Sequence, residues 1–156
     1  FTAETLTEDI EVTGHVQVNL YLKSATPDGS VFAYLEDVDE DGNVWKVTDG
    51  QFRFVHRKLQ EEAPHYQDVV PYHSYTKADA QPMDTTKVEF ISFDMLPTSH
   101  LFKKGHKMQI RFSGVDVYNF KNLYPEGGAW EIYHDAEHPT NIDLPIIERS
   151  VVMGAK

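Results

Sequence analysis

The sequence has no cysteine, which excludes disulfide bonds, cysteine-ligated zinc and thiol catalysis. This absence is compatible with a reducing compartment and favours a cytoplasmic location. No apolar run approaches the roughly 18 residues that a membrane span needs, so no membrane partner is expected. Basic residues are scarce as well: 14 Lys and Arg stand against 25 Asp and Glu, which gives a net charge of −11. This balance argues against nucleic acids and anionic membrane surfaces as partners, because both bind basic surfaces.

The chain is long enough for one domain with a substantial core. A chain of this size buries about 68–70% of the surface that its unfolded form exposes. The hydrophobic share of 40% and the aromatic share of 12% argue against disorder. We therefore expect a single domain over residues 1–156. Because the first residue is Phe1 and not methionine, we expect this domain to be a piece of a longer chain.

Alternation of apolar and polar residues is the main structural signal. It is clearest from Val16 to Leu22 and from His106 to Ser113, and it places apolar side chains on one face of a strand. No segment carries a helical apolar stripe longer than two turns. Strands are predicted at residues 12–23, 31–38, 44–47, 51–57, 87–96, 106–113, 130–134 and 142–147, with turns at 27–29, 41–42 and 48–50. The pattern predicts an all-β domain, a β-sandwich or jelly roll.

Residues 59–84 interrupt the strand pattern. They contain Pro64, Pro71 and Pro82 and show no sustained period. Loops of this length are uncommon in compact domains and usually have a function or pack on something else. The segment also carries aromatic and imidazole side chains, namely His65, Tyr66, Tyr72, His73 and Tyr75. We therefore predict a loop that docks on another surface, with a long surface excursion as the alternative.

An acidic run beginning at Asp37 matches the start of a calcium-binding loop. Asp37, Asp39 and Asp41 occupy its first, third and fifth positions, and Gly42 occupies the sixth. The twelfth position, however, is Thr48, where such a loop has a bidentate glutamate, and strands are predicted on both sides. We therefore favour a solvated hairpin tip and keep a calcium site at the three aspartates as the alternative.

Two histidines near the end of the chain have the spacing of a zinc motif. His134 and His138 are four residues apart, so on a helix both rings would face one metal. Pro139 follows directly and restricts the preceding residue to conformations outside the helix. No third ligand is evident nearby. We interpret this segment as a turn in which His and Asp side chains bond to the backbone.

The sequence carries no catalytic constellation. None of its serines lies in a G-x-S-x-G elbow, and Gly127-Gly128 lacks the spacing and the lysine of a phosphate loop. Trp45 and Trp130 could form a platform for a sugar, but core packing is the favoured interpretation. We expect no catalytic residue, no metal and no cofactor in this chain.

The order of short motifs resembles that of a known family. The motifs are TEDIEVTG at 7–14, DVDEDG at 37–42, TDGQFR at 48–53, YHSY at 72–75, ADAQP at 78–82, LPTS at 96–99, FKKGH at 102–106 and IYHDAEHP at 132–139. Together they resemble the C-terminal, non-catalytic domain of X-Pro dipeptidyl-peptidases and cocaine-esterase-type (CocE/NonD) serine hydrolases. The resemblance covers nearly the whole chain.

This resemblance implies a galactose-binding-like jelly roll that follows an α/β-hydrolase domain. The catalytic Ser, Asp and His of the family lie in the hydrolase domain, and no residue here matches them. His134 and His138 match a motif of the end domain. The implied role is to pack on the hydrolase domain of the same chain and to shape the surroundings of its active site or an oligomer interface. The implied activity of the longer chain is hydrolysis of X-Pro peptides, esters or acyl amides.

Contact with the hydrolase domain is expected to come from aromatic residues between strands, because interfaces favour them. The expected contact residues lie in segments 59–84 and 116–128 and are Tyr66, Tyr72, His73, Tyr75, Tyr118, Phe120 and Tyr124. Two alternatives remain open at this point. One is a free-standing carbohydrate-binding jelly roll, and the other is a calcium-stabilised sandwich built on Asp37, Asp39 and Asp41.

Overall fold

The computed structural model describes residues 1–62, 64, 69–122 and 128–148. Within them the strands are β1 (Ile10–Gly14), β2 (Gln17–Ser24), β3 (Ser30–Val38), β4 (Val44–Arg53), β5 (Glu89–Asp94), β6 (Thr98–Phe102), β7 (Lys107–Ser113), β8 (Trp130–Tyr133), β9 (Asn141–Asp143) and β10 (Ile146–Ile147). A short 3-10 turn, η1 (Phe54–His56), follows β4. The described residues form no α-helix, and none of their helical turns is long and apolar enough to cross a membrane. The predicted all-β class is confirmed.

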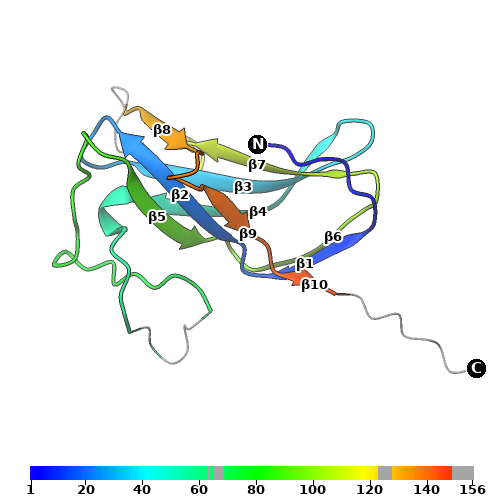
Figure 1. The fold of residues 1–156 in the computed structure, drawn as a ribbon, viewed down its shortest axis with the longest axis horizontal. Helices are drawn as coiled ribbons and strands as arrows, with labels where there is room; N and C mark the ends of the chain where they lie inside the picture. Colours follow the sequence, from blue (N-terminus) through cyan, green and yellow to red (C-terminus); the bar gives the residue numbers. More distant parts are fainter. Residues whose placement is uncertain (63, 65–68, 123–127, 149–156) are drawn as a thin grey trace, which may run out of the picture.

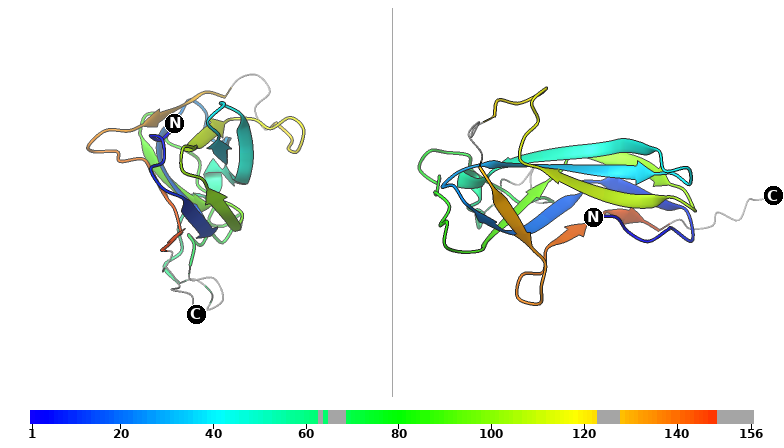
Figure 2. Two further views of the ribbon diagram at one scale, coloured as in Figure 1. Left: turned by 90° about the vertical axis from the view of Figure 1, so that its right-hand side faces the viewer. Right: turned by 90° about the horizontal axis from the view of Figure 1, so that it is seen from above.

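The strands pair antiparallel in three sheets. One sheet has the order β4-β3-β7, the second has the order β5-β2-β8 with β9 also paired to β2, and the third has the order β10-β1-β6. Figure 1 shows β1 and β2 following one another along the long axis of the domain. Figure 2 shows the β4-β3-β7 sheet as a separate layer beside β2. The core lies between these layers.

Alternation along β2 determines which side chains fill the core. Val16, Val18, Leu20 and Leu22 are fully buried, as the sequence predicted. They belong to one cluster with apolar side chains of β3, β4, β5 and β7. Because β-branched and leucine side chains at every second position point to the same face, one strand contributes a continuous apolar row.

Strand β3 is buried on both faces. Val31, Ala33 and Leu35 point into the core, while Phe32 and Tyr34 on the opposite face are also buried. The outer face of an antiparallel sheet is commonly solvated and polar. Phe120 and Asp116, which contact Phe32 and Tyr34, cover part of this outer face and belong to the candidate site described below.

The turn predicted at residues 48–50 is wrong, because β4 runs through it without interruption. Gly50 serves a close approach of two backbones instead. A Cβ atom at this position would lie 2.7 Å from the carbonyl oxygen of Asp94 and 2.9 Å from Cα of Met95. The adjacent backbone bond, from the N–H of Leu96 to the carbonyl oxygen of Asp49, holds the two segments together at 2.9 Å.

Replacing Gly50 with alanine is expected to lower the free energy of unfolding by about 1–3 kcal/mol, the usual cost of overpacking. The new methyl group would meet main-chain atoms, which cannot rotate away. Denaturant unfolding of the variant and the parent chain measures the difference. A change below about 0.5 kcal/mol, typical of an open surface position, would contradict the close approach.

Strand β6 was not predicted, because residues 97–105 were expected to form a turn-rich connection. The structure pairs β6 with β1 along its full length, from Thr98 opposite Gly14 to Phe102 opposite Ile10. Phe102 is fully buried and joins the core cluster. A five-residue strand after Pro97 with only two adjacent large apolar residues has too little alternation to be recognised from sequence.

The second half of the long connection between β4 and β5 is anchored to the rest of the domain. We call residues 72–84 the strap. The backbone N–H of Gln81 donates to the carbonyl oxygen of Val55 at 2.8 Å, and that of Met83 donates to the carbonyl oxygen of Pro27 at 2.7 Å. Arg57 contacts the carbonyl oxygens of Gln81 and Pro82. The strap is therefore part of the body of the domain.

Candidate docking site

The predicted calcium ligands do not converge in the structure. Asp37 is buried and accepts hydrogen bonds from His100 at 2.9 Å and from His106 at 2.8 Å. Asp39 instead accepts the backbone N–H groups of Asp41 and Asn43, at 3.0 and 2.8 Å. These bonds fit the favoured hairpin tip. The residues that the structure describes contain no group of three or more His, Asp or Glu arranged to hold a metal ion.

The two C-terminal histidines lie in a tight turn between β8 and β9. The Asp135 carboxylate accepts the backbone N–H groups of Glu137 and His138, both at 2.9 Å. The hydrogen bond with the His138 ring, together with these backbone bonds, lowers the pKa of Asp135 from its ordinary value. His134 forms an isolated bridge with Pro139. This geometry agrees with the turn interpretation.

Exposed apolar side chains gather in the connection between β7 and β8. Within residues 114–122, which we call the β7–β8 loop, Val115, Val117, Tyr118 and Phe120 are all exposed. Tyr118 is 95% exposed and Val117 is 69% exposed. Single exposed apolar residues are normal, but a contiguous group marks an interaction surface. Figure 2 shows this loop projecting from the β4-β3-β7 layer.

Asp116 organises the loop from below. Its carboxylate accepts the backbone N–H of Tyr118 at 3.3 Å and that of Asn119 at 3.2 Å, and it also accepts the Asn119 side-chain amide. The hydroxyl of Tyr34, on the outer face of β3, donates to the same carboxylate at 3.1 Å. The hydrogen bond from Asn119 is the largest of the causes that lower the pKa of Asp116 below 3.8. The loop is thus bonded to the sheet through one carboxylate.

Packing under the loop adds to this attachment. The Phe120 ring lies 5.1 Å from the Phe32 ring, centroid to centroid. The guanidinium of Arg111 lies 4.2 Å over the Tyr34 ring, a cation–π contact. Burial and the Asp116 carboxylate raise the pKa of the Tyr34 phenol. A fixed base therefore holds Val117 and Tyr118 in solvent, a preorganised arrangement that reduces the entropic cost of binding.

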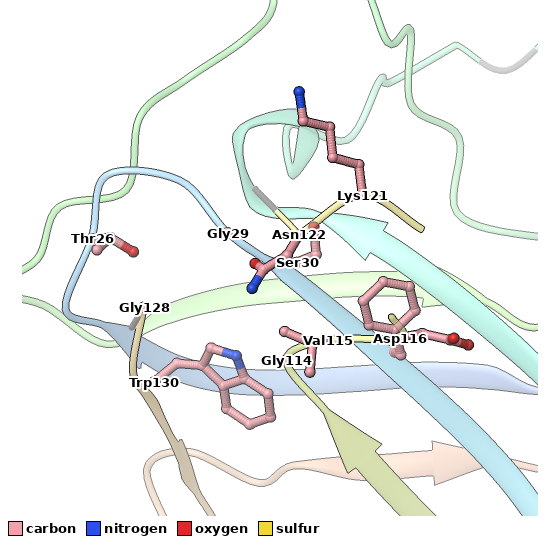
Figure 3. Close-up of a pocket in the computed structure, with 11 residues that line it drawn as sticks. Thr26, Gly29, Ser30, Gly114, Val115, Asp116, Lys121, Asn122, Gly128 and Trp130 are labelled. Atoms are coloured by element: carbon pink, nitrogen blue, oxygen red, sulfur yellow. The ribbon is translucent and has the colours of Figure 1, made fainter. Parts of the chain in front are cut away.

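A small pocket lies at the foot of the loop. Gly114, Asp116, Lys121, Asn122 and Trp130 surround it together with the turn between β2 and β3, and the Trp130 ring lies at its edge (Figure 3). Its volume of about 60 Å³ is roughly that of two water molecules. The pocket is too small for a substrate but can take a small side chain of a partner.

Replacing Asp116 with alanine is expected to speed hydrogen exchange at the Tyr118 amide by at least about tenfold, because it loses its acceptor, and less at the Asn119 amide, which keeps the Asp116 backbone carbonyl at 3.3 Å. Exchange followed by NMR measures this. Asp135→Ala is the matched control, since it removes an equivalent turn carboxylate and should speed exchange only at Glu137 and His138. Unchanged exchange at Tyr118 would show that the loop does not depend on Asp116.

Acid should have the same effect as the Asp116 substitution. The folded-state pKa of Asp116 is lowered, so its stabilising contribution is complete above 3.8. That contribution is lost as the pH falls through the lower folded-state value. Protection at Tyr118 should therefore stay constant near neutrality and fall only in strong acid. A loss of protection between pH 5 and pH 7 would point to another group.

The predicted contact residues separate into different environments. Tyr118 and Phe120 lie in the β7–β8 loop, and Tyr75 is exposed on the strap. Tyr72 is partly buried beside the sheet of β2 and β5. Tyr66 and Tyr124 lie outside the described residues. Trp130 packs on the core as expected, whereas Trp45 is exposed on the β3–β4 hairpin.

His73 has to be removed from the contact residues. It is only 3% exposed, and its ring nitrogens lie 3.2 Å from the carbonyl oxygen of Lys58 and 2.8 Å from that of Ser92. Its ring also packs on Phe52 with a centroid separation of 4.7 Å. His73 therefore fixes the strap to β5 and is not available to a partner.

Two residues of the candidate site were missed, namely Val115 and Val117. Sequence reasoning selected aromatic residues between strands, and valine in such a segment gives no distinct signal.

Tyr75 carries a signal that only the structure shows, because its φ of 53° lies in the left-handed region that non-glycine residues seldom adopt. Such strain is concentrated at functional sites.

The fold and the exposed apolar β7–β8 loop are those of an all-β accessory domain. Comparison with known proteins agrees, because residues 1–122 match the X-Pro dipeptidyl-peptidase C-terminal non-catalytic domain. The chain belongs to this family, whose domain is non-catalytic and forms the C-terminal part of CocE/NonD-type serine hydrolases. The predicted resemblance is confirmed.

Two relatives of the chain are named as esterases. A Mycobacterium bovis protein, named as a candidate serine esterase, is 40% identical over 148 residues, which cover 95% of this chain and 24% of that protein. Cocaine esterase from a Rhodococcus species is 26% identical over 162 residues, covering 96% of this chain and 25% of the esterase. The chain thus spans about a quarter of the length of these relatives.

A solved structure shares the fold. A CocE/NonD family hydrolase from Staphylococcus aureus superposes with a TM-score of 0.77 at 21% identity, and the match covers 94% of this chain and 30% of that one. At this identity the likeness concerns the fold alone.

Proposed function

We propose that this chain works as the C-terminal domain of a longer serine hydrolase and packs on the α/β-hydrolase domain of the same polypeptide. The observation that carries the proposal is the family match over residues 1–122. The 40% identity to a protein of which the chain covers only 24% supports it, because most of that relative lies outside the shared domain. We further propose that the sandwich is one jelly-roll domain of galactose-binding-like type.

The surface proposed for this contact is the β7–β8 loop. Tyr118 buries almost nothing within the domain and Val117 is 69% exposed, so most of their apolar area remains for a partner. Interfaces are rich in tyrosine and phenylalanine at their centres, and truncating such residues costs most of the binding energy. The small pocket beside Trp130 would receive a side chain of the hydrolase domain. Docked in this way, the domain would support the walls of the active site or an oligomer interface.

The proposed reaction of the longer chain is hydrolysis of an ester, an acyl amide or an X-Pro peptide bond. The names of the two relatives support an ester, and the name of the family supports an X-Pro peptide. The nucleophile, base and oxyanion hole would all belong to the hydrolase domain. This chain would hold the hydrolase domain in position and shape the surroundings of its active site.

The 156-residue chain alone is expected to release no nitrophenol from p-nitrophenyl acetate and no nitroaniline from Ala-Pro-p-nitroanilide above the buffer rate. The longer protein that carries it should cleave at least one of them. A longer protein with its nucleophilic serine changed to alanine is the control for contaminating hydrolases. The proposal would be overturned if hydrolytic activity co-eluted with the isolated chain in two successive purification steps.

A further inference from the structure

We propose that the cavity between the outer face of β2 and β5 and the first half of the long connection binds a neutral carbohydrate. The cavity has a volume of about 420 Å³, within the range of small-molecule sites. Its floor comes from outward-facing residues of β2 and β5, and its walls come from residues 59–61 and 69–72. The β7–β8 loop packs elsewhere, on Phe32 and Tyr34 of the outer face of β3.

The floor of the cavity is a hydrogen-bonded network of neutral side chains, which the Asp143 carboxylate anchors from outside the lining. The side-chain oxygen of Asn19 accepts hydrogen bonds from the Gln17 amide at 3.0 Å and from the Ser92 hydroxyl at 2.7 Å. The Asn19 amide in turn donates to Asn141 at 2.9 Å and to Asp143 at 2.8 Å. Because every hydrogen-bonding position of Asn19 is used, the floor cannot reorient. The side-chain carbonyl oxygen of Gln17 accepts no hydrogen bond in the described part of the chain, so it can accept one from a ligand.

Gln60 supplies an unsatisfied donor at the wall. Its backbone N–H donates to the carbonyl oxygen of Tyr72 at 3.0 Å, and this bond joins the two lining segments, residues 59–61 and 69–72. Its side-chain Nε2 atom is buried and has no hydrogen-bond partner among the described residues. Unpaired buried amides are rare because they lose their bonds to water. Because this atom is buried, the Gln60 side chain would have to turn toward the cavity for a ligand oxygen to accept its hydrogen bond.

The remaining lining selects the chemical class of ligand. Phe90 is 40% exposed, and its ring lies 5.0 Å from the Tyr21 ring on the same sheet face. Glu61 is the one charged side chain among the described lining residues, so none of them supplies a cation for a phosphate or carboxylate. A sugar combines hydroxyl groups, which both donate and accept, with an apolar C–H face that packs on an aromatic ring. The side-chain amides of Gln17 and Gln60 can bond to such hydroxyl groups, and the Phe90 ring can pack on the C–H face.

An extended peptide fits less well than a sugar. Peptides that bind to a sheet usually pair with the free edge of a strand. On the edge of β5, the carbonyl oxygen of Ser92 is already taken by the His73 ring at 2.8 Å, which interrupts the row of groups that a peptide strand would pair with. A ligand in the cavity must therefore be recognised by side chains, as sugars are.

Titration of the ¹⁵N-labelled chain with simple sugars tests the site. The probes are methyl glucoside, methyl galactoside, methyl mannoside, N-acetylglucosamine, maltose and cellobiose, each to about 50 mM so that millimolar binding is visible. A proline-rich peptide and inorganic phosphate form two further arms. The expected result is a saturable shift of the Gln60 side-chain amide signal with at least one sugar and with neither other probe.

Gln60→Leu and Phe90→Ala are each expected to weaken that binding at least about tenfold. Gln51→Leu, an exposed glutamine on β4, should change it less than about twofold. Thermal unfolding separates binding from stability: the Gln60→Leu chain should melt no lower than the parent, because the buried Nε2 atom that it loses has no hydrogen-bond partner among the described residues. A purely structural Gln60 would instead lower the melting temperature.

Three outcomes would overturn the proposal. These are no saturable shift with any sugar, binding that Gln60→Leu and Phe90→Ala leave unchanged, and a shift with the peptide or phosphate alone. Calorimetry on the longer protein repeats the titration in the intact polypeptide. Neither readout depends on hydrolysis or on the β7–β8 loop. A negative sugar titration would therefore leave the proposed accessory function intact, and failure of the accessory function would leave the proposed sugar site intact.

Discussion

Replacing Arg57 with leucine is expected to lower the free energy of unfolding by about 3–5 kcal/mol, the cost of breaking a buried ion pair from one side. The Arg57 side chain is 11% exposed, and that of its partner Glu89 is 18% exposed. The guanidinium also donates to the carbonyl oxygens of Gln81 and Pro82, so its loss would release the strap from the end of β4. Equilibrium unfolding in urea, followed by tryptophan fluorescence, measures the change.

Two control variants make this result specific. Lys103→Met removes an equal charge from an exposed pair with Asp9 and should cost no more than about 1 kcal/mol. The double variant Arg57→Leu, Glu89→Leu should recover part of the loss, because no carboxylate is then left without its partner. If Arg57→Leu alone costs less than the Lys103 variant, the strap is not held in the way that the structure shows.

Changing Val117 and Tyr118 together to aspartate is expected to weaken the contact with the hydrolase domain at least about 100-fold in Kd, as the loss of a central pair of contact residues does. The stability of the chain alone should not change, because Tyr118 is 95% exposed and Val117 is 69% exposed. Calorimetry between the separately prepared chain and hydrolase domain measures the contact. Protease cleavage between the domains of the longer protein measures it within one polypeptide.

The hairpin tip of β3 and β4 offers a matched control for this pair. Val44 and Trp45 are also adjacent, apolar and about half exposed, at 52% and 51%. Changing both to aspartate adds the same charge on a different part of the surface and should change Kd less than about twofold. Equal losses from the two double variants would indicate a general charge effect and would remove the β7–β8 loop as the contact surface.

Much of the fold follows from local sequence, because period-two alternation is a local property. Val18, Leu20 and Leu22 predict both strand β2 and its buried face, and the structure agrees. Gly50 shows the limit of local reasoning: a glycine after Thr48-Asp49 resembles a turn, but here it admits the backbone of a distant segment, Asp94-Met95. The strap was beyond prediction, because its bonds join residues far apart in sequence.

The candidate site was predicted in part. Aromatic content alone identified Tyr118 and Phe120, which the structure places in one organised loop. The same criterion selected His73, whose ring is used internally, since composition does not distinguish a buried imidazole from an exposed one. The cavity beside Gln60 could not be predicted, because it arises where β2, β5 and the long connection meet.

The proposed accessory role is tested most directly by photo-crosslinking from position 118 of the longer protein. With p-benzoylphenylalanine in place of Tyr118, irradiation followed by mass spectrometry should identify peptides of the hydrolase domain as the main products. The same group at position 45 should yield few such peptides. Crosslinks from position 118 only to a second copy of the chain, or none to the hydrolase domain, would contradict the proposed docking surface.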